Sequence, residues 1–423
     1  MEPSMPRGVR DSPPEEAILI REIVSTIEEI FKRFGFYPIE TPSLETLDVL
    51  NAKSYGEESA KQIYTLSDER SGLRYDFTVP LARYLAMNKD TPLPFKRYQI
   101  GNIWRKDEPQ RMRYREFLQA DVDIVGSQEL LSDAEVVAAP AFAMEELGIE
   151  NYRILLNDRI FIDGVLSKFG VKQEDFQKAI KIIDKLPKYS VDEIIQDLST
   201  LCSGKNAEAI IGFITKGGSN EEILARLSAE IPALKAEIEK FSKWMNLLNA
   251  YGIKNAIVDL SLARGLDYYT GFVWEFIQFE NEKRLPSIGG GGRYDGLMEL
   301  YSGRSLAATG MSLGISRILD IVKDRPIRKT YARVLVSYIT QENMDYALSI
   351  AQKLRAAGIY TDINVMNRSI TKQLEYANSL KFKYIIILGD KEKAESKVKL
   401  RDMLSGNEEM LVTDDAIKVL KGE

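Results

Sequence analysis

Histidine is missing from this sequence: none of the 423 residues is a histidine. Its absence excludes a Ser-His-Asp triad, a histidine general base and every metal site that needs an imidazole ligand. Cysteine is nearly as scarce, since Cys202 is the single one. No internal disulfide can form, and a reducing compartment is compatible with this composition. Any chemistry must therefore use carboxylates, guanidinium groups, tyrosines and backbone donors.

Long apolar runs are also missing. No stretch approaches the roughly 18 apolar residues of a membrane span, and the opening MEPSMPRGVRDSPPEE lacks the apolar centre of a signal peptide. We therefore expect a cytoplasmic protein with no membrane partner. The net charge of −6 provides no global attraction for nucleic acid, so such binding would require local basic patches. The chain length predicts two or three domains.

The pattern along the chain predicts a β-rich core that is interrupted by helices and followed by a separate domain. An amphipathic helix over residues 12–35 precedes an extended segment with two prolines, which is typical of an edge strand at a subunit interface. After a basic linker at 323–332, strands and helices alternate, which predicts an α/β domain with a largely parallel sheet. The expected divisions are a core at 1–160 and 251–325, a helical insertion at 161–250, and the last domain at 330–423.

One predicted strand, YREFLQADVDIVG, carries an unusual polar face. Its side chains alternate with a period of two residues. One side is apolar and belongs to the core: Leu118, Ala120, Val122 and Ile124. The other side is polar and acidic with an aromatic at its end: Phe117, Gln119, Asp121 and Asp123. Two interpretations are open, a solvated strand face or the wall of a polar site.

Arginines are concentrated in RKDEPQRMRYRE, a predicted loop just before that strand. Guanidinium forks bind phosphate bidentately, so a pocket here could hold a phosphate chain beside a cationic group. Phe117, at the return of the loop, could stack on an adenine. The sequence has no G-x-x-x-x-G-K-[ST] loop, and GGGGRYDG does not match G-x-G-x-x-G. A glycine run alone usually marks a turn, but this one predicts a flexible glycine floor near Arg317.

The segment ARGLDYYTG, at 263–271, combines a cationic fork at Arg264 with the rings and hydroxyls of Tyr268 and Tyr269. Such side chains can hold a small, polar and partly anionic molecule. The segment taken alone is more typical of the start of a strand that carries ordinary surface tyrosines.

Taken together, these segments resemble the three motifs of class II aminoacyl-tRNA synthetases and the signature of the histidyl enzymes. The matching segments, in chain order, are FGFYPIETPSLE, FKRYQIGNIWRKDEPQRMRYREFLQADVDIVG, ARGLDYYTG and GMSLGISRIL. The resemblance covers nearly the whole chain. It implies an α+β fold in which an antiparallel sheet core with a helical insertion is joined to a C-terminal α/β anticodon-binding domain.

The resemblance also implies an activity and its partners. These are ATP-dependent activation of L-histidine, transfer to the 3′ end of tRNA(His), Mg²⁺ as the accompanying ion and a homodimer. The chain itself is not expected to provide a dedicated metal site. The residues implied for ATP are Arg105, Arg113, Phe117 and Arg317. Those implied for histidine are Asp76, Thr78, Arg105, Gln119, Asp123, Arg264, Tyr268 and Tyr269. Arg105 and Arg264 are the implied catalytic pair.

Three positions depart from the most frequent family pattern. Asp76 and Asp123 stand where many bacterial members have glutamate, which matches the archaeal and eukaryotic branch. Asp107 stands where class II enzymes usually have glutamate, so its role toward adenine is open. A second function stays possible, a non-aminoacylating, histidine-binding paralogue that regulates ATP phosphoribosyltransferase. Such paralogues lack the anticodon-binding domain, whereas this chain retains a domain at 330–423.

Overall fold

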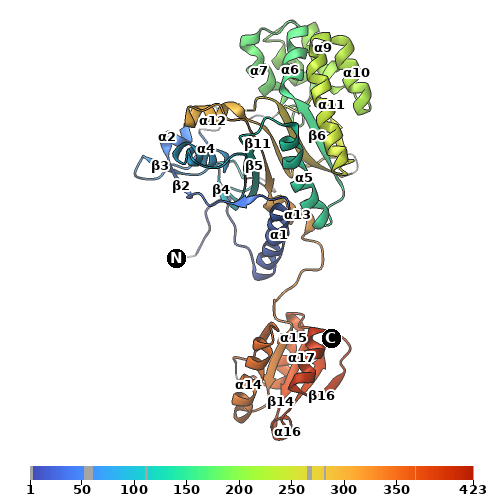
Figure 1. The fold of residues 1–423 in the computed structure, drawn as a ribbon. Coiled ribbons are helices and arrows are strands. Elements are labelled where there is room, and N and C mark those ends of the chain that lie inside the picture. Colours follow the sequence, from blue (N-terminus) through green and yellow to red (C-terminus); the bar gives the residue numbers. More distant parts are fainter. Residues whose placement is uncertain are drawn as a thin grey trace. The chain divides into compact units, whose positions relative to one another are not determined.

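The computed structural model describes residues 3–51, 61–109, 113–263, 269–280, 283–366 and 368–422. These residues form two compact units. The larger unit contains Met1–Arg10 and Ile23–Val322, and the smaller contains Asp11–Glu22 and Lys323–Glu423. Figure 1 draws both units, which are treated separately below. Within the described residues, no helix combines the length and the apolar character needed to cross a membrane.

A nine-stranded sheet, counted over the described residues, organises the larger unit. Its order is β1-β4-β5-β11-β10-β8-β6-β7, and β9 pairs with β8. The pairs β1/β4 and β6/β7 are parallel and the others are antiparallel, which confirms the predicted antiparallel core. The strands are β1 (Tyr37–Pro38), β4 (Phe95–Trp104), β5 (Glu116–Val125), β6 (Tyr152–Asp158), β7 (Ala256–Val258), β8 (Phe272–Glu280), β9 (Lys283–Arg284), β10 (Gly289–Arg293) and β11 (Ala308–Gly314).

The glycine run, which the sequence predicts to be a flexible floor near Arg317, forms the strand β10 inside the sheet. Its neighbours on both sides, β8 and β11, come very close. A Cβ atom at Gly291 would overlap the backbone of Gly310, and one at Gly292 would lie 2.7 Å from the carbonyl oxygen of Phe272. Glycine is therefore needed here for close strand approach and not for a turn.

Helices and a small ribbon cover the sheet. α4 (Thr78–Met87) packs against α12 (Asp295–Ser302), and α5 (Leu130–Glu146) packs against β11 and β5. The core between α4, α12 and the sheet includes Val79, Leu85, Tyr269, Tyr294 and Leu297. The remaining elements of this part are α2 (Leu47–Asn51), α13 (Ile315–Val322) and the two-stranded ribbon of β2 (Leu44–Thr46) and β3 (Ser71–Leu73). The helix α1 (Pro14–Arg33) is divided, since its residues from Ile23 on belong to the larger unit and those before it to the smaller one.

A group of helices follows β6 and lies together at one end of the larger unit (Figure 1). Stacked rings join it to the sheet, since Trp244 on α11 lies 4.6 Å from Phe272 on β8, measured between ring centroids. The group comprises α6 (Arg159–Lys168), α7 (Phe176–Ile183), α8 (Val191–Leu198), α9 (Gly204–Thr215), α10 (Asn220–Glu230) and α11 (Lys235–Ala250).

The smaller unit has a five-stranded sheet in the order β13-β12-β14-β15-β16. The predicted parallel sheet is only partly right, because β13, β12 and β14 are parallel while β15 and β16 are antiparallel. Short connections after β14 and β15 leave no room for the crossover that parallel strands need. The elements are β12 (Val334–Tyr338), α14 (Met344–Ala356), β13 (Thr361–Ile363), α15 (Ile370–Ser379), β14 (Tyr384–Leu388), α16 (Asp390–Ala394), β15 (Lys397–Asp402), β16 (Glu408–Val412) and α17 (Thr413–Lys421).

Candidate active site

The polar face of β5 is buried, so the interpretation of a solvated strand face was wrong. Gln119, Asp121 and Asp123 are 5%, 1% and 2% exposed. The register sets Asp123 opposite Arg97 on β4 and opposite Gly310 on β11. Two adjacent strands, β4 and β5, therefore gather charged groups on one face of the sheet, and β11 places a glycine beside them. A buried acidic face is costly unless its charges are paired or compensated by a ligand.

Arg97, Asp123 and Tyr294 form a buried network on this face. The Arg97 side chain is fully buried, and its Nη2 lies 2.6 Å from Oδ2 of Asp123. Nη2 also donates to the carbonyl oxygen of Phe77 at 3.3 Å, and the Tyr294 hydroxyl donates to Oδ1 of Asp123. Burial raises the pKa of Asp123, while Arg97 and Tyr294 oppose that rise. Burial also raises the pKa of Tyr294 well above its usual value, so this phenol stays a donor.

Asp121 is held next to this network. Nε2 of Gln119 donates to Oδ1 of Asp121 at 2.7 Å. Burial raises the pKa of Asp121 to about 7; the Arg97 guanidinium opposes the rise and the Asp123 carboxylate adds to it. The face thus holds a shared acidic centre around one arginine.

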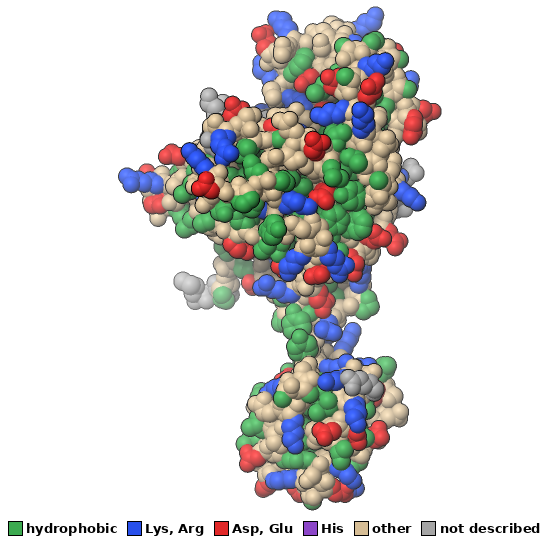
Figure 2. Space-filling view, viewed as in Figure 1, with side chains coloured by type: hydrophobic (Ala, Val, Ile, Leu, Met, Phe, Trp, Pro, Cys, Tyr) green, Lys and Arg blue, Asp and Glu red, His purple; other side chains and the backbone are tan. Residues whose placement is uncertain are grey.

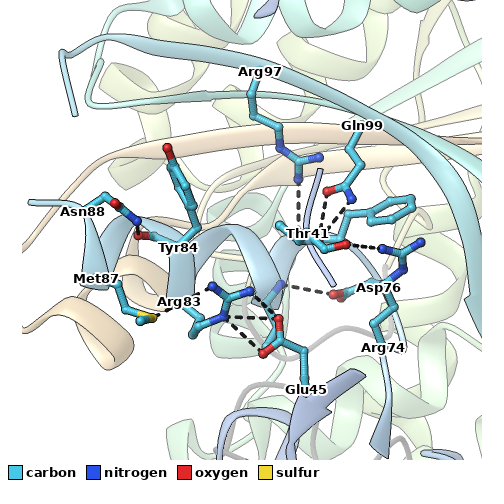
Figure 3. A network of polar contacts seen from close by, with 12 residues as sticks. Thr41, Glu45, Arg74, Asp76, Arg83, Tyr84, Met87, Asn88, Arg97 and Gln99 are labelled. Carbon is cyan, nitrogen blue, oxygen red and sulfur yellow. Dashed lines mark hydrogen bonds and ion pairs between the residues drawn. The ribbon is translucent and has the colours of Figure 1, made fainter. Parts of the chain in front are cut away.

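Asp76 and Thr78 lie where the chain enters α4, beside the same centre. Oδ1 of Asp76 accepts from the backbone N–H of Val79 at 3.1 Å. Asp76 and Thr78 are 5% and 6% exposed. Figure 3 shows this entry and the surrounding network, in which Arg97 points toward the backbone just before α4. The Asp76 charge also acts on Asp123 and helps to raise its pKa. The sequence-predicted acids of the site are therefore brought together.

Arg105 and Phe117 meet at the far end of the β4–β5 pair. The Arg105 guanidinium carbon lies 4.3 Å from the ring centroid of Tyr75 and 5.3 Å from that of Phe117. Nε of Arg105 donates to the carbonyl oxygen of Tyr75 at 3.2 Å. These contacts fix a cation between two rings, which is a suitable surface for an anionic group next to a flat base.

Arg113 is paired with Asp107 through two parallel contacts. Its Nε and Nη2 lie 2.8 and 3.0 Å from the two carboxylate oxygens. Asp107 is 5% exposed, whereas the Arg113 side chain is 42% exposed. This pair gives Asp107 a structural role that the sequence left open. It also keeps the Arg113 fork at the rim of the face.

Arg317 lies on the first turns of α13, directly after β11. Its Nη1 donates to the carbonyl oxygen of Ser287. The last residue of β11, Gly314, is paired with Gln119 on β5, so α13 starts near the end of β5 that carries Phe117. The geometry is consistent with Arg317 and Phe117 at the same end of the face.

The histidyl signature is only partly described. Arg264 and Tyr268 lie outside the described residues. Tyr269 is described and is 9% exposed. Its ring packs so closely on β10 that a Cβ atom at Gly292 would lie 2.7 Å from it. The end of the signature is therefore anchored beside Tyr294 in the same core cluster.

Sequence reasoning missed the central cation and two of its partners. The sequence assigned no role to Arg97 or Tyr294, and it identified Asp121 only as part of a polar strand face. Pairing the hairpin of 95–104 with 116–125 residue by residue would have placed Arg97 opposite Asp123. A second buried pair, Arg293 with Asp133 at 2.6 Å, joins β10 to α5 and had no short-range signal.

Gly310 is predicted to be indispensable for this site. A Cβ atom there would overlap the Asp123 carboxylate and come within 3.1 Å of the Tyr294 ring. We expect Gly310→Ala to lower the free energy of unfolding by about 1–3 kcal/mol through overpacking and to raise the histidine KM strongly. Gly212→Ala on α9 is the matched control, because nothing lies within 4 Å of its added methyl group. Urea unfolding and histidine titration of both variants check this, and equal behaviour of the two would contradict it.

Comparisons with known proteins agree over the whole chain. A family model described as histidyl-tRNA synthetase matches residues 8–318, and an anticodon-binding domain model matches residues 333–423. The histidine–tRNA ligase of Korarchaeum cryptofilum is 41% identical and covers 94% of each chain. That of Clostridium tetani is 33% identical and covers 100% of this chain and 98% of the relative. The crystal structure of histidyl-tRNA synthetase from Nostoc sp. PCC 7120 has a TM-score of 0.88 at 29% identity, covering 100% of this chain and 99% of that one.

An antiparallel sheet with a cationic and an acidic end on one face, joined to an anticodon-binding α/β domain, defines a class II aminoacyl-tRNA synthetase. Within that class, the chain belongs to the histidyl-tRNA synthetase family. The relatives include archaeal and bacterial proteins. The comparisons therefore establish the family, and membership of the archaeal and eukaryotic subgroup stays a prediction.

Proposed function

We propose that this protein activates L-histidine with ATP and transfers the histidyl group to the 3′ end of tRNA(His). The observation that carries the proposal is the division of one sheet face. Arg105 and Phe117 lie at one end of the β4–β5 pair, and the buried acids Asp121 and Asp123 lie at the other. ATP and histidine require these two chemistries side by side. Full-length relatives named histidine–tRNA ligase support the same activity.

ATP is assigned to the cationic end. In this proposal Phe117 and Arg317 enclose the adenine, Arg105 contacts the α-phosphate and Arg113 reaches the distal phosphates. The two parallel contacts of Arg113 with Asp107 support this role, because a phosphate can replace the carboxylate as the partner of the same guanidinium group.

Histidine is assigned to the acidic end. Its ammonium group is held by Asp76, Thr78 and Gln119, and its imidazole by Asp123 with Tyr268 and Tyr269. The raised pKa of Asp123 supports this assignment, since burial around this carboxylate favours a cationic or N–H-donating ligand that compensates its charge. Asp76 and Asp123 are also the basis on which we propose membership of the archaeal and eukaryotic branch.

The chemistry needs no protein base. An oxygen of the histidine carboxylate attacks the α-phosphorus of ATP, the bond to the bridging oxygen between the α- and β-phosphates breaks, and pyrophosphate leaves with the electron pair. Arg105 and Arg264 stabilise the charge that develops on the α-phosphate oxygens. The oxygen of a terminal ribose hydroxyl of tRNA then attacks the acyl carbon, and the bond from that carbon to the phosphate oxygen breaks. AMP leaves with the electron pair, and one of its phosphate oxygens takes up the hydroxyl proton. Neither step uses a histidine side chain of the protein, so both are compatible with a sequence that contains none.

Mg²⁺ is proposed as part of the nucleotide substrate. Among the residues that the structure describes, no group of three or more Cys, Asp or Glu side chains could hold a metal ion. Mg²⁺ commonly binds substrate phosphates and keeps several waters, so an all-protein cage is not required. We therefore assign it to the phosphates of ATP and derive no step through it.

The domain at 330–423 is proposed to bind tRNA. The chemistry is assigned to the catalytic core at 1–160 and 251–325, and the helical insertion at 161–250 is given no role. Acidic and basic side chains are interspersed over the visible face (Figure 2), so tRNA must use local patches. One cavity of about 700 Å³ in the smaller unit offers such a patch, with no acid among its lining residues. Its cations are Arg328, Lys329, Arg333, Lys381, Lys383 and Lys421.

A chain that ends at Lys329 is expected to retain adenylate formation and to lose tRNA affinity. We expect its tRNA KM to rise at least about tenfold, equivalent to about 1.4 kcal/mol. Charging at limiting tRNA measures this, with histidine-dependent pyrophosphate exchange as the control for an intact core. Unchanged charging would assign the domain to another partner, and loss of exchange would mean that it supports the core.

A homodimer is proposed from exposed apolar side chains on neighbouring elements of the larger unit. Leu44 on β2, Met87 on α4 and Leu300 on α12 are 52%, 73% and 52% exposed. α4 and α12 pack against each other, so Met87 and Leu300 lie on neighbouring helices. Light scattering of the full chain measures the mass, and a monomer at micromolar concentration would overturn the proposal.

A cytoplasmic location is proposed because charged tRNA is consumed by translation there.

The alternative, a regulatory paralogue that binds histidine without aminoacylation, predicts a different result. The match of residues 333–423 to an anticodon-binding domain favours the ligase. Histidine-dependent exchange of labelled pyrophosphate into ATP decides between them. The ligase predicts exchange that requires histidine, and the paralogue predicts histidine binding with none.

A further inference from the structure

Asp121 is a buried carboxylate to which neither the resemblance nor the proposed chemistry gives a role. It is 1% exposed and lies on the site face of β5, between Gln119 and Asp123. Its cross-strand partners are Gln99 on β4 and Ser312 on β11. A carboxylate this deeply buried is costly, so its retention requires a compensating interaction.

Beside the Arg97 charge, the amide of Gln119 provides such an interaction. Nε2 of Gln119 lies 2.7 Å from Oδ1 of Asp121. The residues paired with Gln119 on either side are Gly101 and Gly314, neither of which has a side chain. An ionised carboxylate can only accept hydrogen bonds. Asp121 therefore takes the NH₂ end of the amide and leaves the carbonyl oxygen, Oε1, turned away from itself.

The direction of this amide matters for an ammonium ligand. An ammonium group only donates, so it needs the Oε1 end of Gln119 and is repelled by the Nε2 end. We infer that Asp121 is a positioning residue that orients the Gln119 amide so that Oε1 faces the substrate's ammonium group. This inference rests on the proposed function, in which Gln119 contacts the amino group of histidine.

The charges around Asp121 determine when this orientation holds. Arg97 and the Ser312 hydrogen bond favour the ionised form, and Asp123 opposes it. Arg74 and Tyr294 also face this carboxylate. Burial raises the pKa of Asp121 to about 7. Once protonated, Asp121 can donate to Oε1, and the amide can then turn its NH₂ end toward the ammonium.

The test compares two ligands that differ only in the amino group, histidine and 3-(imidazol-4-yl)propionate. Asp121→Asn can either donate or accept, so it no longer fixes the amide. We expect the histidine Kd to rise about tenfold to hundredfold, the range for a hydrogen bond to a charged group. The propionate Kd and the ATP KM are expected to stay within about threefold of the wild type. Binding is measured by calorimetry on the full-length protein without ATP.

The double variant Gln119→Glu with Asp121→Asn is the decisive arm. The introduced asparagine amide then donates to one oxygen of the introduced glutamate, and the other oxygen accepts from the ammonium, with the net charge unchanged. We expect the histidine Kd to return to within about threefold of the wild type. Glu116→Gln is the matched control, because Glu116 accepts from the Asn102 amide at 2.8 Å on the same two strands at an exposed position. This control should change neither Kd.

The pH profile provides an independent readout. The imidazole of histidine has a lower pKa than that of the propionate, because the nearby ammonium group disfavours a second positive charge. Each Kd is therefore corrected for the imidazole titration of the free ligand, measured separately, before the ratio is taken. In the wild type, the preference for histidine over the propionate should fall as the pH drops below about 7, in line with the raised pKa of Asp121. In Asp121→Asn, which has no titratable group at this position, it should stay flat over the same range.

The inference is overturned if Asp121→Asn weakens both ligands equally, or if the folded double variant does not recover histidine binding. Thermal unfolding of each variant identifies a loss of fold. If Asp121→Asn does not fold, the double variant and the wild-type pH profile still decide whether Asp121 orients the Gln119 amide. Wild-type protein that neither binds histidine nor supports histidine-dependent exchange would instead overturn the proposed function.

Discussion

Replacing Arg97 by methionine is expected to lower the free energy of unfolding by about 3–5 kcal/mol and to abolish measurable histidine binding. Arg97 is fully buried and its Nη2 lies 2.6 Å from the Asp123 carboxylate. Its charge also offsets Asp121, so the variant leaves two buried carboxylates without their cation. Removing one partner of a buried pair costs far more than the pair contributes when intact, because the remaining charge stays desolvated. Urea unfolding and histidine calorimetry measure the two effects.

Lys96→Met is the matched control for this variant. Lys96 is the preceding residue on β4 and pairs with Glu135, but both side chains are about a quarter exposed. Water screens such a pair, so we expect a loss of no more than about 1 kcal/mol. A third variant, Arg97→Met with Asp123→Leu, removes both charges and should recover part of the lost stability. If Arg97→Met is no less stable than Lys96→Met, the central role given to Arg97 is wrong.

The strand that carries the site shows how far the sequence alone could lead. The alternation over residues 117–124 was read correctly, because a two-residue period is a local property of the chain. Whether the polar side is buried or solvated is not a local property of the chain. It depended on the neighbouring strands β4 and β11, and β11 lies far along the chain from β5. Arg97 became interpretable only when the register placed it opposite Asp123.

The glycine run shows a limit of another kind. Four consecutive glycines have the composition of a turn, but here they form a strand. Glycine is needed in this strand because β8 and β11 leave no room for Cβ atoms between them. The same applies to Gly310, whose missing Cβ makes room for the Asp123 carboxylate. Local propensity favours strands with side chains, and tertiary packing overrode it here. By contrast, Arg105 and Phe117 were predicted together and lie together, since both flank one short connection.

The mixed sheet of the smaller unit follows the same rule. Its first three strands were predicted as parallel because helices separate them, and they are parallel. The last two pairs are antiparallel because their connections are short. Connection length was visible in the sequence, so this error was avoidable.

Replacing Arg264 by alanine is expected to slow histidyl-adenylate formation by about 10²–10³-fold and to leave the histidine Kd within about threefold of the wild type. The reason is the charge that develops on the α-phosphate when the carboxylate attacks, which a fixed guanidinium stabilises more in the transition state than in the ground state. Arg264 itself lies outside the described residues, but the flanking Ala263 and Tyr269 are 4% and 9% exposed. Both ends of the signature are thus anchored in the core beside the site face.

Single-turnover measurements separate this role from a general loss of binding. Adenylate formation should be slow in the variant. Transfer from preformed adenylate to tRNA should be slowed much less, because this step attacks the acyl carbon and does not form the pentavalent α-phosphorus that Arg264 is proposed to stabilise. Arg21→Ala on α1 is the control, as its side chain is exposed. Arg264→Lys keeps the charge and loses the planar fork, so it should recover only part of the rate. Near-normal adenylate formation in Arg264→Ala would remove Arg264 from the chemistry and leave Arg105 as the single proposed protein cation on the α-phosphate.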